Sequence, residues 1–442
     1  MGGVTTTGFL NKTFRNIKRV WREIAASEYD AEKATLRPDL PRNDAKKLLR
    51  QMHSCLENLG GEVSARARAA ALGQVYLALD PIGRKRFLKV VAENFNVDKN
   101  TVLNFADQLL KTTNDLDWKN AKINIRRALE PSWIRLLTQF NALPDGIKFL
   151  VDMRAELLDF VKIDTVFAEL EADLKSLLST WFYVDFLELR LITWENTPAA
   201  TLEKLIDYEA VHAIESWNDM KNRLESDRRC FAYFHPRMPE EPIIFVEVAL
   251  VDGIAENISD LLDEKAPIID PTSANTAIFY SISNAQKGLK GISFGNFLIK
   301  RVVGQLSSEL PNLKLFSTLS PIPGFRKWCD VERIEQSKFL ESSISNSQET
   351  RIELLKLAAH YLTEVKGLNK EAFDRVAHFH LYNGARIEQI NWMADQSPRG
   401  LKQSAGMMVN YVYDLDIIED NHEAYTTNGT IAVSNNVKGL LT

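Results

Sequence analysis

The chain has 442 residues, of which 45% are hydrophobic and 26% are charged, a composition typical of folded globular proteins. Its 54 basic and 59 acidic residues give a formal net charge of -5, which argues against a nucleic-acid partner but leaves room for a local phosphate site. No segment reaches the roughly 18 apolar residues of a membrane-spanning helix, so we expect no membrane partner. The three cysteines are scattered, which disfavours a disulfide framework or a zinc site and favours a reducing compartment.

Apolar residues recur every three or four positions from residue 10 to about residue 181, as in amphipathic helices. The first predicted helix carries Phe14, Ile17, Val20, Trp21 and Ile24 on one face. Further helices are predicted at 63–79, 82–95, 99–111, 117–129, 131–141, 147–161 and 166–181. The sequence has no repeat of fixed length, so we predict an all-α helical bundle over residues 1–175. Its apolar stripes exceed what one bundle layer needs, which predicts a homo-oligomer, either a dimer or a tetramer, assembled through this domain.

After about residue 180 the sequence becomes rich in predicted strands. Short helices at 199–209 and 216–225 precede them. Strands are predicted at 229–234, 243–251, 276–283 and 313–319. A long helix is predicted at 294–310, further helices near 350–365, and a mixture of strands and loops over 376–415. Strand, helix and strand in short succession indicate an α/β domain over residues 176–442, and the whole chain is therefore of the α+β class.

The first candidate site is a glycine-bearing loop between the strand that ends at Asn284 and the following helix. Glycines let backbone N–H groups approach a ligand, and a helix start presents free donors, so this loop predicts a pyrophosphate site. The candidate residues are Gln286, Lys287, Gly288, Leu289, Lys290, Gly291, Ile292 and Ser293. The loop lacks both standard nucleotide fingerprints, and it is similar to the coenzyme A loop of GNAT-type acyltransferases. The alternative is an ordinary turn between a strand and a helix.

The second candidate site precedes the rigid segment Pro321-Ile322-Pro323-Gly324. Ser317, Thr318 and Ser320 are its polar candidates, and strand alternation places Ser317 on the face opposite to the other two. A hydrogen bond to the backbone is the alternative role for any one of these hydroxyl groups. No G-x-S-x-G elbow is present, which disfavours an α/β-hydrolase triad.

The third candidate site contains His378 and His380, which point to one side if their segment is extended. No third ligand follows at a characteristic spacing, so we expect no metal there. A single general acid or base, or two histidines with structural hydrogen bonds, are the remaining roles. Near the C-terminus, Tyr411 and Tyr413 share one face of a predicted strand.

Several long stretches resemble the malonyl-CoA decarboxylase family. They are FYSISNAQKGLKGISFGNFLIKRVV, LFSTLSPIPGFRKW, HFHLYNGARIEQINWMADQSPRGL and GMMVNYVYDL. The resemblance implies a helical oligomerisation domain and a GNAT-like catalytic domain with a central mixed sheet. It implies conversion of malonyl-CoA, the expected substrate, to acetyl-CoA and carbon dioxide without metal or organic cofactor. It assigns catalysis to Ser317, His380 and Tyr413, and coenzyme A binding to the loop that ends at Ser293.

The chemistry agrees with this resemblance, because the thioester of the substrate is itself an electron sink. We expect His380 to protonate C2 of the enolate, and Ser317 to hold the departing carboxylate or to relay a proton. Tyr413 and Asn383 would orient these groups. His378 stands where the family commonly has asparagine, which places an additional titratable group beside the site. The chain ends in Gly-Leu-Leu-Thr and lacks a peroxisomal Ser-Lys-Leu signal, so a cytoplasmic enzyme is expected.

Two other functions remain open at this stage. One is a GNAT-type acyltransferase that moves an acyl group from coenzyme A to an amine. The other is a non-catalytic sensor that binds malonyl-CoA and leaves it intact. Retention of Ser317, His380 and Tyr413 together argues against the sensor, because a sensor has no need of proton-transfer groups.

Overall fold

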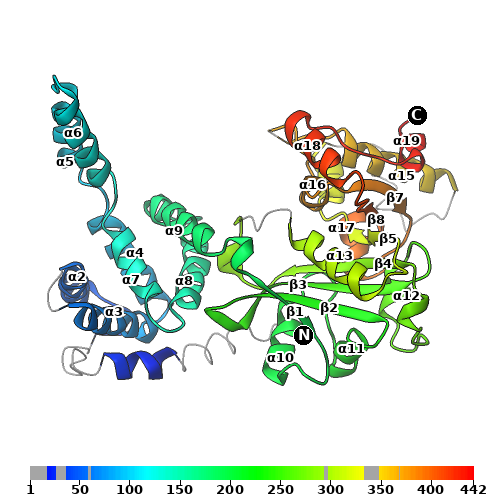
Figure 1. Cartoon of the computed structure of the whole chain (residues 1–442), viewed down its shortest axis with the longest axis horizontal. Coiled ribbons are helices and arrows are strands. Elements are labelled where there is room, and N and C mark those ends of the chain that lie inside the picture. Colours follow the sequence, from blue (N-terminus) through cyan, green and yellow to red (C-terminus); the bar gives the residue numbers. More distant parts are fainter. Residues whose placement is uncertain (1–16, 26–35, 58–60, 293–296, 333–347, 368) are drawn as a thin grey trace. The chain divides into compact units, whose positions relative to one another are not determined.

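The computed structural model describes residues 17–25, 36–57, 61–292, 297–332, 348–367 and 369–442. The chain forms two compact units (Figure 1). The first comprises the chain as far as Phe186 together with two short later segments, Pro236–Pro239 and Gln286–Ser293, and the second comprises the remainder. The sequence-based boundary at residue 175 lies inside the last helix of the first unit.

The first unit is built from helices, as the apolar periodicity predicted. They are α2 (Arg42–Leu56), α3 (Gly61–Ala78), α4 (Pro81–Asn94), α5 (Lys99–Leu110), α6 (Asp115–Ala128), α7 (Trp133–Asn141), α8 (Gly146–Phe160) and α9 (Ala168–Trp181). Residues 17–24 are helical too, and the Trp21 indole, fully buried, donates a hydrogen bond to the Pro144 carbonyl at 2.7 Å. Phe14, predicted to share this helix, lies outside the described residues.

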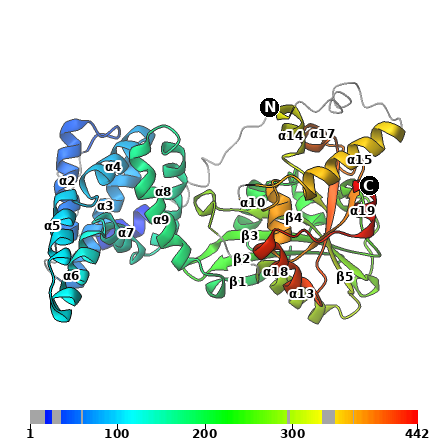
Figure 2. The same cartoon turned by 90° about the horizontal axis from the view of Figure 1, so that it is seen from above.

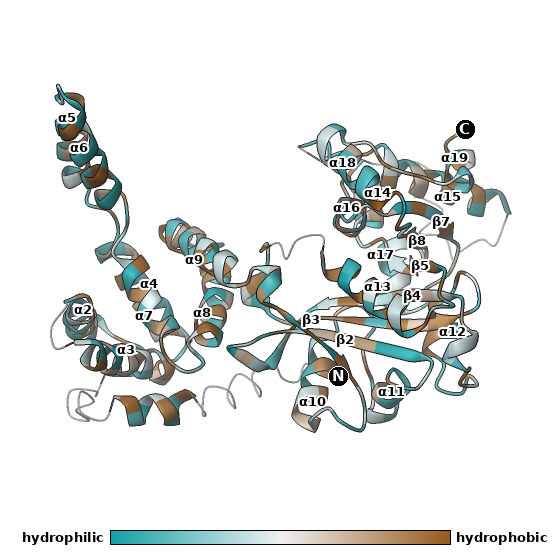
Figure 3. Cartoon of the chain, viewed as in Figure 1, coloured by the Kyte–Doolittle hydropathy of each residue, from teal (hydrophilic) through white to brown (hydrophobic). Residues whose placement is uncertain are grey.

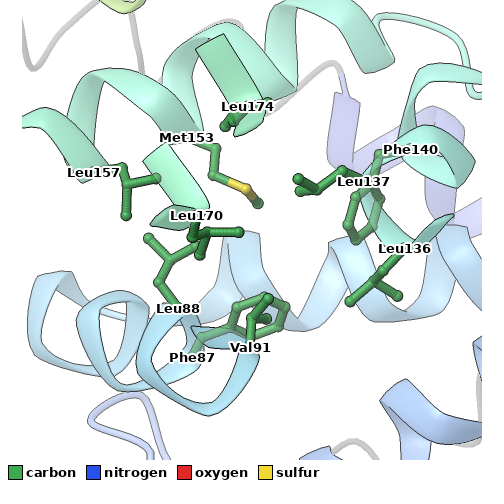
Figure 4. Close-up of a pocket in the computed structure, with 10 residues that line it drawn as sticks. All are labelled: Phe87, Leu88, Val91, Leu136, Leu137, Phe140, Met153, Leu157, Leu170 and Leu174. Atoms are coloured by element: carbon green, nitrogen blue, oxygen red, sulfur yellow. The ribbon is translucent and has the colours of Figure 1, made fainter. Parts of the chain in front are cut away.

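The core of the first unit lies where α4, α7, α8 and α9 meet (Figure 4). The side chains around its centre are all apolar, and they are Phe87, Leu88, Val91, Leu136, Leu137, Phe140, Met153, Leu157, Leu170 and Leu174. They leave a void of about 10 Å³, which is too small and too apolar to hold an ordered water. We therefore regard this space as ordinary core packing and not as a ligand site.

The second unit is organised by one eight-stranded sheet with the order β1-β2-β3-β4-β5-β8-β6, in which β7 also pairs with β8. The strands are β1 (Glu188–Ile192), β2 (Arg228–His235), β3 (Met238–Val251), β4 (Thr276–Asn284), β5 (Leu315–Thr318), β6 (Ser320–Pro321), β7 (Arg386–Asn391) and β8 (Met408–Val412). β4 and β5 are parallel, whereas β3 and β4, and β5 and β8, are antiparallel. This mixed sheet, together with the helical first unit, confirms the expected α+β class.

Helices cover both faces of the sheet (Figure 2). On one face, α10 (Ala199–Tyr208) and α11 (Trp217–Asn222) pack against Cys230, Ala232 and Phe234 of β2. On the other face, Tyr233 donates a hydrogen bond to the Leu298 carbonyl of α13 (Phe297–Glu309) at 2.7 Å. The alternation of side chains along β2 thus accounts for the two layers. The crossover through α13 makes β4 and β5 parallel.

The C-terminal part adds further helices around the strands. They are α12 (Ile258–Leu262), α14 (Phe325–Val331), α15 (Gln348–Thr363), α16 (Arg375–Tyr382), α17 (Pro398–Ser404), α18 (Ile418–Asn428) and α19 (Asn435–Leu441). α16 corrects the expectation that the segment with His378 and His380 is extended. Asp374 caps this helix by accepting hydrogen bonds from the backbone N–H groups of Val376 and Ala377. Among the described residues, no helix has the length and apolar character needed to cross a membrane.

Candidate active site

Three polar side chains of the second unit form a continuous hydrogen-bonded row. Ser320 begins β6, His380 lies near the end of α16, and Tyr413 follows β8 directly. The His380 Nε2 atom is 3.0 Å from the Ser320 Oγ atom, and the His380 Nδ1 atom is 2.7 Å from the Tyr413 Oη atom. All three residues are buried. The fold therefore brings a serine, a histidine and a tyrosine from distant segments into direct contact.

One arrangement of protons satisfies every contact in this row. Ser320 donates to the Thr318 Oγ1 atom at 2.9 Å, which leaves the Ser320 oxygen free to accept a hydrogen bond from His380 Nε2. Tyr413 then donates to His380 Nδ1, which needs a lone pair in that tautomer. Tyr413 thus fixes both the tautomer and the orientation of the imidazole ring.

The surroundings of His380 favour its neutral form. Burial lowers the pKa of the imidazole to about 3. The Tyr411 ring stacks on it, with 4.5 Å between ring centroids and 22° between planes. Burial also raises the pKa of Tyr413 well above its usual value, so this phenol stays protonated. The row is therefore electrically neutral near pH 7 before it transfers a proton.

The strand geometry explains why Ser320 faces His380. β5 ends at Thr318, and the chain continues through Leu319, whose N–H group bonds to the Phe279 carbonyl at 3.0 Å. The chain then pairs again with β8, with Ser320 opposite Val409. The rigid Pro-x-Pro-Gly segment that follows holds this position.

Asp374 links the serine segment to the histidine helix, and sequence reasoning did not identify this role. Besides capping α16, its carboxylate accepts hydrogen bonds from the Gly324 N–H group at 3.2 Å and from the Tyr361 hydroxyl at 3.3 Å. Gly324 has no room for a side chain, because an added Cβ would lie 2.2 Å from the Tyr361 hydroxyl. Aspartate before a helical segment is a recognised N-cap signal, so this residue was identifiable in the sequence.

Two of the residues predicted to act in catalysis lie outside the row. The Ser317 hydroxyl is fully buried and bonds only weakly to the Thr318 carbonyl, at 3.3 Å. Asn383 ends α16, where its side-chain amide donates to the Phe379 carbonyl at 2.6 Å. The geometry thus brings together His380 and Tyr413 of the predicted set, and the serine in contact with His380 is Ser320. The catalytic role predicted for Ser317 stays a prediction.

His378 is not beside this row, contrary to the expectation from an extended segment. Residues two apart in an α-helix point about 200° apart, so the two histidines leave α16 in different directions. The His378 Nδ1 atom is 2.9 Å from the Tyr425 hydroxyl of α18. Within the described part of the chain, no group of three or more histidine, cysteine, aspartate or glutamate side chains has a geometry that suits a metal ion.

The predicted phosphate loop belongs to the first unit and not to the sheet unit. Its residues Lys287–Leu289 form a 3-10 turn, in which Leu289 and Lys290 donate their backbone N–H groups to loop carbonyls at 3.0 and 3.1 Å. Gly288 packs directly on α8, because an added Cβ would lie 1.8 Å from the Val151 carbonyl oxygen. Ser293 lies outside the described residues. Gly288 therefore serves contact with a helix, a role that the sequence did not suggest.

A buried arginine of α8 holds this loop. Arg154 donates to the carbonyl oxygens of Gly288 and Lys290 at 2.5 and 2.9 Å. The other side of its guanidinium group bonds twice to Glu171 of α9, at 2.7 and 2.9 Å. The loop conformation is thus determined by two helices of the first unit.

Comparisons with known proteins give a consistent family assignment. The model of the malonyl-CoA decarboxylase C-terminal domain matches residues 185–442, and that of the malonyl-CoA decarboxylase N-terminal domain matches residues 95–182. The mitochondrial malonyl-CoA decarboxylase of the goose Anser anser anser is 35% identical over 419 residues, which cover 84% of this chain and 83% of the relative. The mouse enzyme, also named as mitochondrial, is 37% identical over 363 residues, with 73% of each chain covered.

Solved structures agree with these sequence matches. The crystal structure of malonyl-CoA decarboxylase from Rhodopseudomonas palustris has a TM-score of 0.84 and 39% identity, and the match covers 89% of this chain and 99% of that one. The enzyme from Agrobacterium vitis has a TM-score of 0.82 and 38% identity, with the same shares covered.

Proposed function

The chain belongs to the malonyl-CoA decarboxylase family, and on that basis we propose that it converts malonyl-CoA to acetyl-CoA and carbon dioxide at the row formed by Ser320, His380 and Tyr413. The observation that carries this site assignment is the pair of contacts at 3.0 and 2.7 Å that connect the three side chains through His380.

The reaction needs little from the protein beyond positioning and a proton. The bond between C2 and the carboxylate carbon breaks, and its electron pair moves into the thioester as an enolate while carbon dioxide leaves. One proton then adds to C2. Because the thioester holds the electrons, we propose that the enzyme uses no metal and no organic cofactor, and that coenzyme A is present only as part of the substrate.

Ser320 is the group that would deliver the proton. Both ring nitrogens of His380 are already bonded to protein groups, so its proton reaches the substrate through the Ser320 hydroxyl. Ser320 gives its proton to C2 and receives the proton of His380 Nε2, while Tyr413 gives its proton to His380 Nδ1. The three residues then carry one negative charge, which is removed when they take up a proton from water. The neutral imidazole suits this exchange, because a proton added at one nitrogen is matched by loss at the other.

We propose that the loop Gln286–Ser293 contacts the phosphate groups of coenzyme A. Its lysines provide positive charge, although the Lys287 ammonium group already pairs with Asp159 at 2.5 Å. Lys290 is exposed and remains the better candidate of the two. Binding of the distant phosphates would position the small malonyl group for reaction.

We also propose that the protein is a homo-oligomer formed through its helical unit. The hairpin of α5 and α6 extends from the other helices of that unit (Figure 1), and Figure 3 shows apolar stretches along it. Leu110 is 85% exposed and Leu116 is 68% exposed, and α5 contains no buried residue. A second copy of this hairpin would cover these side chains, because symmetric contacts join like surfaces.

A cytoplasmic location is proposed as well. Cys55, Cys230 and Cys329 are all free thiols and all buried, as expected for a reducing compartment. The goose and mouse relatives are named as mitochondrial proteins, so detection of this protein in an organellar fraction of its cells would contradict the proposal.

The function is tested by incubating purified, chelator-treated protein with malonyl-CoA and measuring acetyl-CoA and carbon dioxide. Equal amounts of both products are expected without added metal or cofactor. Formation of an acylated product only when an amine is added would indicate an acyltransferase instead. Tight binding of malonyl-CoA without turnover would indicate a sensor.

A further inference from the structure

In the loop expected to contact coenzyme A, three backbone donors are already engaged. The N–H groups of Leu289, Lys290 and Ile292 bond to carbonyl oxygens of the loop itself, at 3.0 to 3.1 Å. Cationic side chains beside this loop would add charge-assisted hydrogen bonds to a phosphate. Arg154 is not one of them, because its guanidinium group is buried and fully engaged with Glu171 and two loop carbonyls.

Lys175 of α9 places an ammonium group beside the same loop. A Cβ built on Gly291 would lie 3.6 Å from the Lys175 Nζ atom. Gly291 has a φ of +74°, a conformation that favours glycine, so the space between this backbone and the lysine stays open. Among the described residues, Lys175 makes no ion pair within 4.0 Å, whereas Lys287 is neutralised by Asp159. Glu171, one turn before Lys175, forms its ion pair with Arg154.

We propose that Lys175 of the helical unit binds a phosphate group of coenzyme A beside Gly291, together with the exposed Lys290. This inference rests on the proposed function, since it concerns the substrate of the same reaction. A half-buried ammonium group with no ion-pair partner in the described part of the chain, next to an open glycine backbone, suits a phosphate oxygen, which accepts charge-assisted hydrogen bonds. The helical unit then contributes directly to substrate binding, in addition to any role in assembly.

The test compares two substrates that differ in their phosphates. Malonyl-CoA carries them, and malonyl-pantetheine lacks them while keeping the reacting thioester. We expect Lys175→Gln to lower kcat/KM for malonyl-CoA about tenfold, the usual scale for loss of a charged hydrogen bond. The same variant should leave kcat/KM for malonyl-pantetheine unchanged, and Lys175→Arg should retain most of the activity on malonyl-CoA.

Lys46→Gln is the matched control, because it removes one positive charge from an exposed position of α2 in the same unit. This variant should leave kcat/KM unchanged for both substrates. An equal loss on both substrates, or no loss on malonyl-CoA, would overturn the role of Lys175. If the wild-type protein decarboxylates neither substrate, the proposed function fails by itself. Calorimetric titration with coenzyme A then tests whether Lys175 binds a phosphate group. Equal affinities of the wild type and Lys175→Gln for coenzyme A would refute this role.

Discussion

The Nε2 atom of His380 and the Oγ atom of Ser320 lie 3.0 Å apart although 60 residues separate them in the chain. The contact is buried, and it depends on the cap of α16 at one end and on the return of the chain to β8 at the other. Because Tyr413 occupies the second ring nitrogen, the histidine has one proton to offer, and it points at the serine. This relationship leads to the first two predictions.

Replacing each serine in turn separates the two candidates. We expect Ser320→Ala to lower kcat on malonyl-CoA by about 100-fold or more, a typical effect of losing a proton-transfer group. Ser317→Ala should keep kcat within a few-fold, because among the described residues this hydroxyl makes one weak hydrogen bond, with the Thr318 carbonyl at 3.3 Å. Steady-state kinetics measure kcat for both variants, and thermal unfolding shows whether each variant is folded. Inactivity of Ser317→Ala in a folded protein, with full activity of Ser320→Ala, would restore the original assignment.

Tyr413→Phe removes the hydrogen bond to His380 Nδ1 and keeps the ring. The imidazole then loses the group that fixes its tautomer, so we expect kcat to fall by about 10-fold or more while KM changes little. NMR of the histidine ring nitrogens should show a mixture of tautomers in this variant and one tautomer in the wild type. A wild-type tautomer pattern in Tyr413→Phe would show that Tyr413 does not determine the tautomer of the His380 ring.

Protein stability should fall as the pH drops below the usual histidine value. The pKa of His380 is lowered from 6.5 to about 3 by burial. Between these values the unfolded chain binds a proton that the folded chain does not, so the stabilising effect is complete above about pH 6.5 and is lost as the pH falls toward 3. His212, with a pKa lowered to about 4, adds to the same trend.

Urea unfolding at a series of pH values from 4.5 to 7.5 measures this effect. The free energy of unfolding should depend less on pH in His380→Gln than in the wild type, because the variant lacks one group that binds a proton on unfolding. Identical slopes in the two proteins would mean that His380 titrates normally in the folded state.

Removal of Arg154 should release the loop at residues 286–292. Arg154→Met leaves the Glu171 carboxylate and two loop carbonyls without their donor, which costs about 3 kcal/mol or more of stability. We expect faster hydrogen exchange of the loop amides and a larger loss of kcat/KM on malonyl-CoA than on malonyl-pantetheine. Arg84→Met, which removes a less buried partner of Glu156 in the same unit, is the control. Unchanged exchange in the loop of Arg154→Met would contradict the structural role.

The exposed hairpin predicts how the protein assembles. Leu110→Lys combined with Leu116→Lys should reduce the molar mass measured by light scattering, because charges replace apolar side chains that a second copy would cover. Ile163→Lys changes an equally exposed apolar residue outside the hairpin and should not alter the mass. A wild-type mass that corresponds to a single chain would refute the oligomer.

The sequence by itself determined the helical bundle, the strands β2 to β5 and the segments that make the candidate site, whereas β1 was not predicted. These features are local, since apolar spacing, the Asp80-Pro81 helix start and the Pro-x-Pro-Gly segment act within a few residues. Only the tertiary structure decided that Ser320 rather than Ser317 meets His380, because His380 lies against the face of this segment that Ser320 shares with Thr318. It also decided that the segment with both histidines is helical, which separates His378 from the site, and that the phosphate loop packs on α8 and α9. These outcomes depend on contacts between distant residues, such as Arg154 with Gly288 and His380 with Tyr413, which local periodicity does not encode.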